Sequence, residues 1–287
     1  MIEKRSLILA ALLAAVAVPA LAAEQDVVPV VLDAAAVNNA ALAAPVRAGD
    51  KGAAVLRAQI LLDRAHFSPG EIDGAYGANL RQAIAGFQAS RGVGVTGEMD
   101  ASTWAALDQD HAPALVEVTL GPDDVAGPFR PVPENTAAKA RMDALGYTSP
   151  LEALGEKFHA SPALLQQLNP GKDFSRAGES LVVPNVQSAT PLPVVAKVVV
   201  DKSDATVSLV DEAGKVVAQY PASTGSRHDP LPIGDWKIEG VAKHPVFHYN
   251  PRLFWDADAG DSKAILPAGP NNPVGVVWVD LSKPHYG

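Results

Sequence analysis

The apolar residues between positions 46 and 107 recur with helical spacing. Two predicted helices carry them on single faces, Val55, Leu56, Ile60 and Leu61 on the first and Leu80, Ile84 and Phe87 on the second. Such stripes must be buried against another element. After a glycine-rich turn, Asp100 is placed to cap a short third helix that buries Trp104 and Leu107. The pattern predicts a three-helix unit over residues 46–107.

A second ordered stretch is predicted over residues 145–184. Ser149 and Glu152 have the spacing of a capping box, with proline at the first helical position between them. Another helix begins in the same way at Ser161, and residues 181–184 form a short strand. The order strand, helix, helix, strand predicts a βααβ unit.

Proline-rich stretches separate the ordered regions. Residues 113–133 and 184–193 contain too many prolines for a packed helix or a central strand. We interpret both as linkers, and we expect the modules that they join to fold independently.

Residues 194–287 have the pattern of a mostly-β domain. The predicted strands are Lys197–Val200, Thr206–Val210, Lys215–Tyr220 and Val276–Leu281. On the last strand, alternation with its neighbours predicts that Trp278 is half-buried. The fold class is therefore multi-domain α+β, with a three-helix module, a βααβ module and a mostly-β domain in that order.

The N-terminus has the features of a signal peptide over residues 1–22. Lys4 and Arg5 precede an apolar run from Leu7 to Val18, and Ala20 and Ala22 supply the small residues that signal peptidase reads. An uncleaved membrane anchor is the alternative, although the apolar run is shorter than a bilayer requires. We expect export to the periplasm or cell envelope, with no membrane span after cleavage.

Composition narrows the classes of partner. The chain has no cysteine, so disulfides do not stabilise the exported protein and its modules rest on buried apolar cores. A net charge of -9 argues against nucleic acid or an anionic membrane surface as partner. Binding to a neutral or mixed-charge polymer remains open.

Two motifs resemble wall-binding modules. The strings Asp73–Gly77, Phe87–Gln88, Val95–Gly97 and Thr103–Trp104 resemble the peptidoglycan-binding-like helical domain, with a departure at Leu80, where that family has threonine. Most of these residues are expected in core or turn positions. Leu168-Asn169-Pro170 and the closing residues 181–184 resemble a LysM domain, which implies binding to N-acetylglucosamine-containing glycans. A helical hairpin that serves only as a spacer is the alternative.

The C-terminal domain resembles the catalytic domain of the L,D-transpeptidases. The resemblance rests on Ser223–Gly225, Asp229–Ile238, Gly269–Gly275 and Val276–Leu281. It implies a cysteine thiolate that attacks a stem-peptide carbonyl, expels D-alanine and holds a thioester, with no metal or organic cofactor. The family's His-Gly and Ser-His-Gly-Cys segments follow these motifs, so we expect its catalytic residues to lie beyond Gly287 and the domain to be incomplete.

By the same resemblance, His285, Tyr286 and Gly287 are expected to line the approach to the active site. We interpret the chain as a fragment or the product of a broken gene. With no cysteine, residues 1–287 are expected to be catalytically inactive.

Other candidate sites have simpler interpretations. Ser223–Gly225 with the nearby His228 is expected to be a turn and not a catalytic dyad. His244 and His248 are separated by a proline and have no third ligand close by, so a metal site is not predicted. Residues 256–261 depart from a calcium loop and are expected to be solvated, and the resemblance implies that they cover the active site.

The sequence therefore predicts a peptidoglycan L,D-transpeptidase family protein whose partners are glycan strands and stem peptides. The alternative is a non-catalytic peptidoglycan-binding envelope protein that uses the β-rich domain as a platform.

Overall fold

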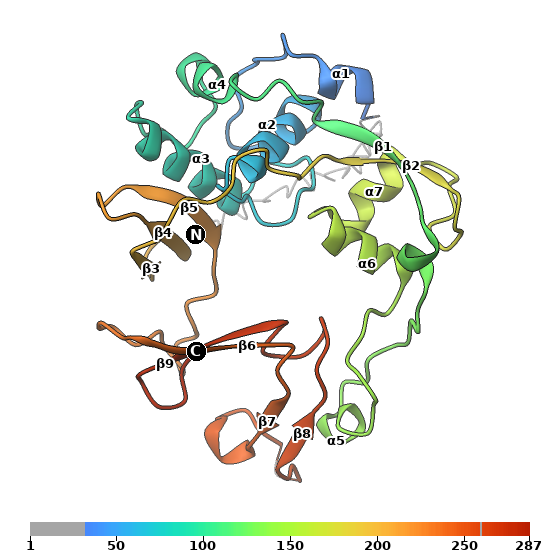
Figure 1. Ribbon diagram of the computed structural model, residues 1–287, viewed down its shortest axis with the longest axis vertical. Helices are drawn as coiled ribbons and strands as arrows, with labels where there is room; N and C mark the ends of the chain where they lie inside the picture. Colours follow the sequence, from blue (N-terminus) through green and yellow to red (C-terminus); the bar gives the residue numbers. More distant parts are fainter. Residues whose placement is uncertain (1–31, 259) are drawn as a thin grey trace, which may run out of the picture. The chain divides into compact units, whose positions relative to one another are not determined.

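The structure is a computed structural model that describes residues 32–258 and 260–287 (Figure 1). The predicted signal segment, residues 1–22, lies outside the described residues. The helices of the N-terminal region are α1 (Ala34–Asn38), α2 (Ala53–Arg64), α3 (Ala78–Arg91) and α4 (Ala101–Leu107).

The prediction of a helical unit in this region is confirmed. Its core, which we call the first core, consists of Val46, Val55, Ala58, Leu61, Leu62, Phe67, Leu80, Ala83, Ile84, Phe87, Met99, Trp104 and Leu107. The Phe67 and Phe87 rings meet edge to face with centroids 5.6 Å apart. Asp100 caps α4 as predicted, because its carboxylate accepts a hydrogen bond from the Thr103 amide at 2.7 Å.

The buried side chain of Gln88 fixes the turn before α4. Its amide nitrogen donates to Thr103 Oγ1 at 2.8 Å and to the Glu98 carbonyl at 2.9 Å. Its amide oxygen accepts from the backbone nitrogens of Thr96 and Gly97 at 2.8 and 2.9 Å. These residues of the motif therefore have a structural role, as expected.

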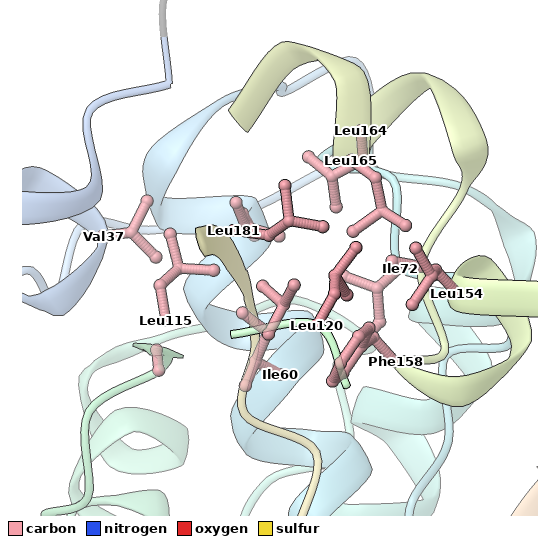
Figure 2. Close-up of a cluster of buried hydrophobic side chains, with 14 residues drawn as sticks. Val37, Ile60, Ile72, Leu115, Leu120, Leu154, Phe158, Leu164, Leu165 and Leu181 are labelled. Atoms are coloured by element: carbon pink, nitrogen blue, oxygen red, sulfur yellow. The ribbon is translucent and has the colours of Figure 1, made fainter. Parts of the chain in front are cut away.

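Helix α2 is buried on two sides, and Figure 2 shows the cluster on one of them, to which Ile60 of α2 belongs. Val55 and Leu61 belong to the first core, whereas Leu56 and Ile60 point into a second core. The single face predicted for these four residues is thus wrong. The second core consists of Val37, Leu56, Ile60, Ile72, Ala114, Leu115, Leu120, Leu154, Phe158, Ala160, Leu164, Leu165, Leu181 and Val183.

The second core joins the helical unit to the next module. Leu56, Ile60 and Ile72 come from the helical unit, and the residues from Ala114 onward come from the segments that follow it. The prediction of independent folding is therefore wrong, because a cut after residue 107 would expose one side of α2 to water.

The strand that pairs antiparallel with β2 (Ser180–Pro184) is β1 (Leu115–Thr119). The βααβ order predicted over residues 145–184 is therefore wrong in its first strand, because residues 145–149 form no strand and the partner of β2 comes from earlier in the chain. The linker interpretation of residues 113–133 is wrong for the five residues of β1. Prolines 113 and 122 lie just outside the strand, where they remove no ladder hydrogen bond. Asn38 extends α1 onto β1, since its side chain donates to the Leu115 carbonyl at 2.9 Å and accepts from the Leu115 amide at 2.8 Å.

Between β1 and the helices of the second module lies a segment that we call the arm, residues 120–149. It contains η1 (Pro122–Val125) and α5 (Thr136–Lys139) and leads into α6 (Pro150–Lys157) and α7 (Pro162–Leu168). The far end of the arm reaches the C-terminal region, where α5 packs beside β8 (Ala264–Leu266) (Figure 1).

Both predicted serine caps are present. Ser149 Oγ accepts from the Glu152 amide at 3.1 Å, and Ser161 Oγ accepts from the Leu164 amide at 3.0 Å. The reciprocal half of the predicted capping box is wrong, because the Glu152 carboxylate accepts from the Thr148 amide at 2.6 Å instead of from its own cap residue.

Asn169 explains the Leu-Asn-Pro motif. Its buried side chain donates to the carbonyls of Leu165 and Val182 at 2.9 and 2.8 Å and accepts from the Val182 amide at 2.7 Å. These bonds tie the end of α7 to β2, so the asparagine stabilises the module and is not free to bind a ligand.

Arg64, at the end of α2, holds the connection from α4 to β1. Its guanidinium donates to the carbonyls of Pro113 and Ala112 at 2.9 and 3.1 Å, and its Nε lies 2.6 Å from the Asp110 carboxylate. The side chain is only 2% exposed. A buried cation that is paired and hydrogen-bonded in this way fixes the path of the chain, and removing the side chain would leave these acceptors unsatisfied.

The C-terminal region is mostly β, as predicted. Its strands are β3 (Lys197–Asp201), β4 (Thr206–Val210), β5 (Val216–Pro221), β6 (Ile238–Lys243), β7 (Phe247–Tyr249), β8 and β9 (Val277–Leu281). They form three antiparallel sheets with the orders β3-β4-β5, β6-β9 and β7-β8. Trp278 on β9 is half-buried, as predicted, and β9 has β6 as its paired neighbour.

This region buries few apolar side chains. Among the described residues after position 194, the buried hydrophobic side chains are Val210, Ala218 and Leu266. By contrast, Ile233 and Trp255 are 79% and 61% exposed. The C-terminal sheets therefore gain little stability from a core of their own and depend on their attachments to the rest of the chain.

One attachment is Gln219 on β5. Its backbone amide donates to the His66 carbonyl, and its carbonyl accepts from the Ser68 amide, both at 2.8 Å. Its side chain donates to the Gln82 carbonyl on α3 at 2.8 Å. Gly86 makes room for this contact, since a Cβ there would lie 2.3 Å from the Gln219 amide oxygen.

A polar contact reinforces the junction of the helical unit with the second module. His159 Nδ1 lies 2.9 Å from the Asp63 carboxylate, and backbone hydrogen bonds link Ile72 to His159 and Ser161 at 2.8 and 2.9 Å. The hydrogen bond to Asp63 raises the pKa of His159 above its usual 6.5, although burial opposes the shift.

We predict that Ile60→Ala destabilises both modules together. Removing a fully buried isoleucine should lower the free energy of unfolding of a fragment of residues 32–184 by about 2–5 kcal/mol. Urea denaturation would be followed by Trp104 fluorescence for the helical unit and by amide exchange of β2 for the second module. Val95→Ala, at a 61% exposed position, is the matched control. A shift in one probe alone would contradict the shared core.

We also predict a pH-dependent contribution from His159. Because its pKa is higher in the folded state, the pair stabilises the fold fully below about pH 6.5, and this contribution is lost as the pH rises through the raised pKa. The free energy of unfolding of wild type minus that of His159→Gln should therefore fall with rising pH. His111→Gln, at an exposed site, should show no such trend. A flat difference for His159→Gln would refute the role of the pair.

Candidate functional site

The Ser-Thr-Gly motif of residues 223–225 follows β5 and forms a turn, as expected. Gly225 has φ +81, and a Cβ there would lie 2.1 Å from the Asp229 carbonyl oxygen, so only glycine fits. The turn closes through a hydrogen bond from the Leu231 amide to the Thr224 carbonyl at 3.1 Å.

His228 lies against an aromatic ring. Its imidazole stacks on Trp255 with centroids 4.2 Å apart and planes at 26°. Among the described residues, no hydrogen bond joins His228 to Ser223. The ring instead connects the turn to the segment after β7. This contact could not be predicted from local sequence patterns, because 27 positions separate the two residues.

The segment after β7 folds back on the strand. It begins with η2 (Pro251–Leu253), and the Phe254 ring stacks on Tyr249 at 5.4 Å. The Tyr249 hydroxyl donates to the Asp261 carboxylate at 2.5 Å, and this hydrogen bond raises the pKa of the phenol to about 12. Asp261 therefore anchors the loop by accepting from a tyrosine.

The motif of residues 269–275 makes a turn and a contact with the second module. Asn272 is buried and closes the turn, donating to the Pro267 carbonyl at 2.7 Å and accepting from the Val274 amide at 2.9 Å. Asn271 points out of the turn and donates to the Glu152 carboxylate at 2.8 Å and to the Gly146 carbonyl at 3.0 Å.

Backbone hydrogen bonds at Leu145 complete this contact. Its amide donates to the Ala268 carbonyl, and its carbonyl accepts from the Asn271 amide, both at 3.0 Å. Gly269 is required here, since a Cβ would lie 2.1 Å from the Leu145 carbonyl oxygen. Sequence analysis missed this second attachment, because nothing in the spacing links Asn271 to Glu152.

His285, Tyr286 and Gly287 follow β9. The Tyr286 carbonyl accepts from the Leu281 amide at 3.1 Å, which folds these residues back on the strand. The Lys283 ammonium lies 4.9 Å from the centroid of the Tyr286 ring and 5.2 Å from that of Trp236. This cation–π pair was also missed. The role of the three residues in approach to an active site stays a prediction.

Comparisons with known families agree with these motifs. Residues 51–107 match a putative peptidoglycan binding domain. Residues 196–287 match the L,D-transpeptidase catalytic domain. The two matches support an L,D-transpeptidase family protein. No curated protein matches the chain.

The histidines of the C-terminal region are dispersed. His244 follows the end of β6, where its amide donates to the Val276 carbonyl at 2.8 Å, and His248 lies on β7 opposite Ile265. In the part of the chain that the structure describes, no three histidine, aspartate or glutamate side chains gather as metal ligands. No helix in that part is long and apolar enough to cross a membrane.

We predict that Asn271→Ala destabilises the turn of residues 269–275. The change removes hydrogen bonds to Glu152 and to the Gly146 carbonyl, which should lower the local opening free energy by about 1–2 kcal/mol. Amide exchange over residues 268–275 should accelerate, as measured by mass spectrometry. Asn250→Ala, which removes a cap of η2, is the control. Unchanged exchange in Asn271→Ala would show that this contact does not hold the motif.

Proposed function

We propose that the chain recognises peptidoglycan and holds its L,D-transpeptidase domain against stem peptides. The match of residues 51–107 to a putative peptidoglycan binding domain carries this proposal, and the closed first core supports it. The second module is proposed to add a LysM-like glycan contact. The peptidoglycan-related domains suggest an envelope-associated protein, and we propose that residues 1–22 direct its export to the periplasm or cell envelope.

The reaction we propose for the transpeptidase domain is acyl transfer in a polypeptide that includes the family's cysteine. The thiolate attacks a stem-peptide carbonyl carbon, a carbon–sulfur bond forms, and the amide bond to the terminal D-alanine breaks as its nitrogen takes a proton. An amine of a second stem then attacks the thioester, gives up a proton and displaces the thiolate. Backbone amides that hold the oxyanion lower both barriers.

Residues 1–287 contain no cysteine, so a polypeptide of these residues has no thiol to form the thioester. For residues 1–287, this observation favours the alternative function, a non-catalytic peptidoglycan-binding envelope protein. Both proposals share wall recognition and differ only in the acyl-transfer step.

Wall recognition predicts that a fragment of residues 32–184 sediments with purified peptidoglycan sacculi. The fragment starts at residue 32 because α1 contributes Val37 to the second core. Cellulose particles of similar size serve as the control matrix. Recovery of the fragment wholly in the supernatant at moderate salt would contradict the proposal.

The missing thiol predicts that the chain forms no covalent adduct with a carbapenem, a β-lactam class that acylates the cysteine of this family. Intact-mass spectrometry after incubation should show the unmodified mass. A stoichiometric increase would mean that another residue is the nucleophile. Ser223→Ala would then test the exposed serine of the Ser-Thr-Gly turn.

A further inference from the structure

A cavity of about 830 Å³ lies where several segments of the chain meet. One side is formed by the C-terminal ends of α2 and α3, another by the residues after α4, a third by the stretch 188–193 that leads to β3, and a fourth by residues 215–217 at the start of β5. We call it the basic cavity. A volume of this size lies within the range of small-molecule sites and accommodates a short peptide.

The charge of the basic cavity is opposite to that of the chain. The chain carries 32 acidic and 23 basic residues. The cavity is lined by Arg64, Arg91 and Lys215 and by one carboxylate, that of Asp110. Since Asp110 lies 2.6 Å from Arg64, these two charges offset each other, and the net positive charge comes from Arg91 and Lys215.

Arg91 and Lys215 make no ion pair with any residue between positions 32 and 258 or 260 and 287. The Arg91 guanidinium lies over the Phe87 ring, 5.1 Å from its centroid. A guanidinium stacked in this way keeps its edge donors available for a bidentate bond to a carboxylate.

The third side of the basic cavity is held in place by His66. Its Nε2 lies 2.7 Å from the Thr190 carbonyl oxygen and 3.3 Å from Ser188 Oγ. Ser188 Oγ also donates to the Thr190 carbonyl at 2.9 Å. Prolines 191 and 193 stiffen the rest of this side. The cavity is therefore formed before a ligand arrives, which limits the entropy lost on binding.

We infer that the basic cavity binds an acidic peptide, namely the stem peptide of peptidoglycan. This inference rests on the proposed function. A stem peptide presents free carboxylates, which match Arg91 and Lys215, whereas the hydroxyl and acetamido groups of a glycan strand have no need of two unpaired cations. The cavity would hold one stem beside the sheet that begins the transpeptidase domain, since Lys215 directly precedes β5.

The test is calorimetric titration of the chain with a soluble tetrapeptide stem and with the same peptide in which every carboxylate is amidated. We expect the free-acid peptide to bind and the amidated peptide to bind about tenfold more weakly. The double variant Arg91→Ala/Lys215→Ala should lose about tenfold in affinity for the free acid. The control Arg141→Ala/Lys202→Ala removes two exposed cations elsewhere and should bind as wild type does.

A charge-preserving variant, Arg91→Lys/Lys215→Arg, guards against misfolding and should retain most of the affinity. Equal binding of the free-acid and amidated peptides would overturn the inference, as would wild-type affinity in the alanine double variant or the absence of any peptide binding. Sedimentation with sacculi distinguishes a failure of the cavity inference from a failure of the proposed function. If wild type sediments but does not bind the peptide, only the cavity inference fails, whereas loss of sedimentation refutes the proposed function itself.

Discussion

The burial of α2 on two opposite sides is the constraint on which the rest of the structure depends. One side closes the first core, and the other, through Leu56 and Ile60, supplies a wall of the second. Each fully buried leucine or isoleucine contributes about 1.5–3 kcal/mol by leaving water. Both the helical unit and the second module would lose part of their core without this helix. We therefore expect the two to fold as one body.

The C-terminal sheets depend on that body in turn. They bury few apolar side chains, and they are attached at two separated points, Gln219 on β5 and Asn271 in the Gly-Pro-Asn-Asn motif. Both attachments are polar and use backbone groups as well as side chains. Directional bonds of this kind fix position more than they add stability. The family motif at residues 269–275 is thereby placed by contacts to the arm and to α6.

Sequence patterns over a few residues predicted many of the helices, caps and strands. They predicted none of the contacts that join distant segments of the chain. Helical periodicity, the Asp100 and Ser149 caps, and the strands of residues 197–220 follow from contacts within a few residues, and each was found. The assignment of α2 to one face failed because periodicity shows which positions are apolar and not how many cores receive them. The pairing of β1 with β2 was missed because 67 positions separate Val116 from Val183 and the intervening prolines obscured a five-residue strand.

The space at Gly86 has a consequence for hybrid proteins. The Gln219 side chain lies in the space left by the missing side chain of Gly86 when it donates to the Gln82 carbonyl on α3. This contact therefore needs both glycine at position 86 and glutamine at position 219. A helical domain with alanine at the position of Gly86 would keep the backbone bonds of Gln219 to His66 and Ser68, but the Gln219 side chain would have to move away from α3. When helical domains are exchanged among transpeptidases, the residue at this position would therefore decide whether the side-chain bond of Gln219 to α3 is kept, which can be read from an alignment before any gene is assembled.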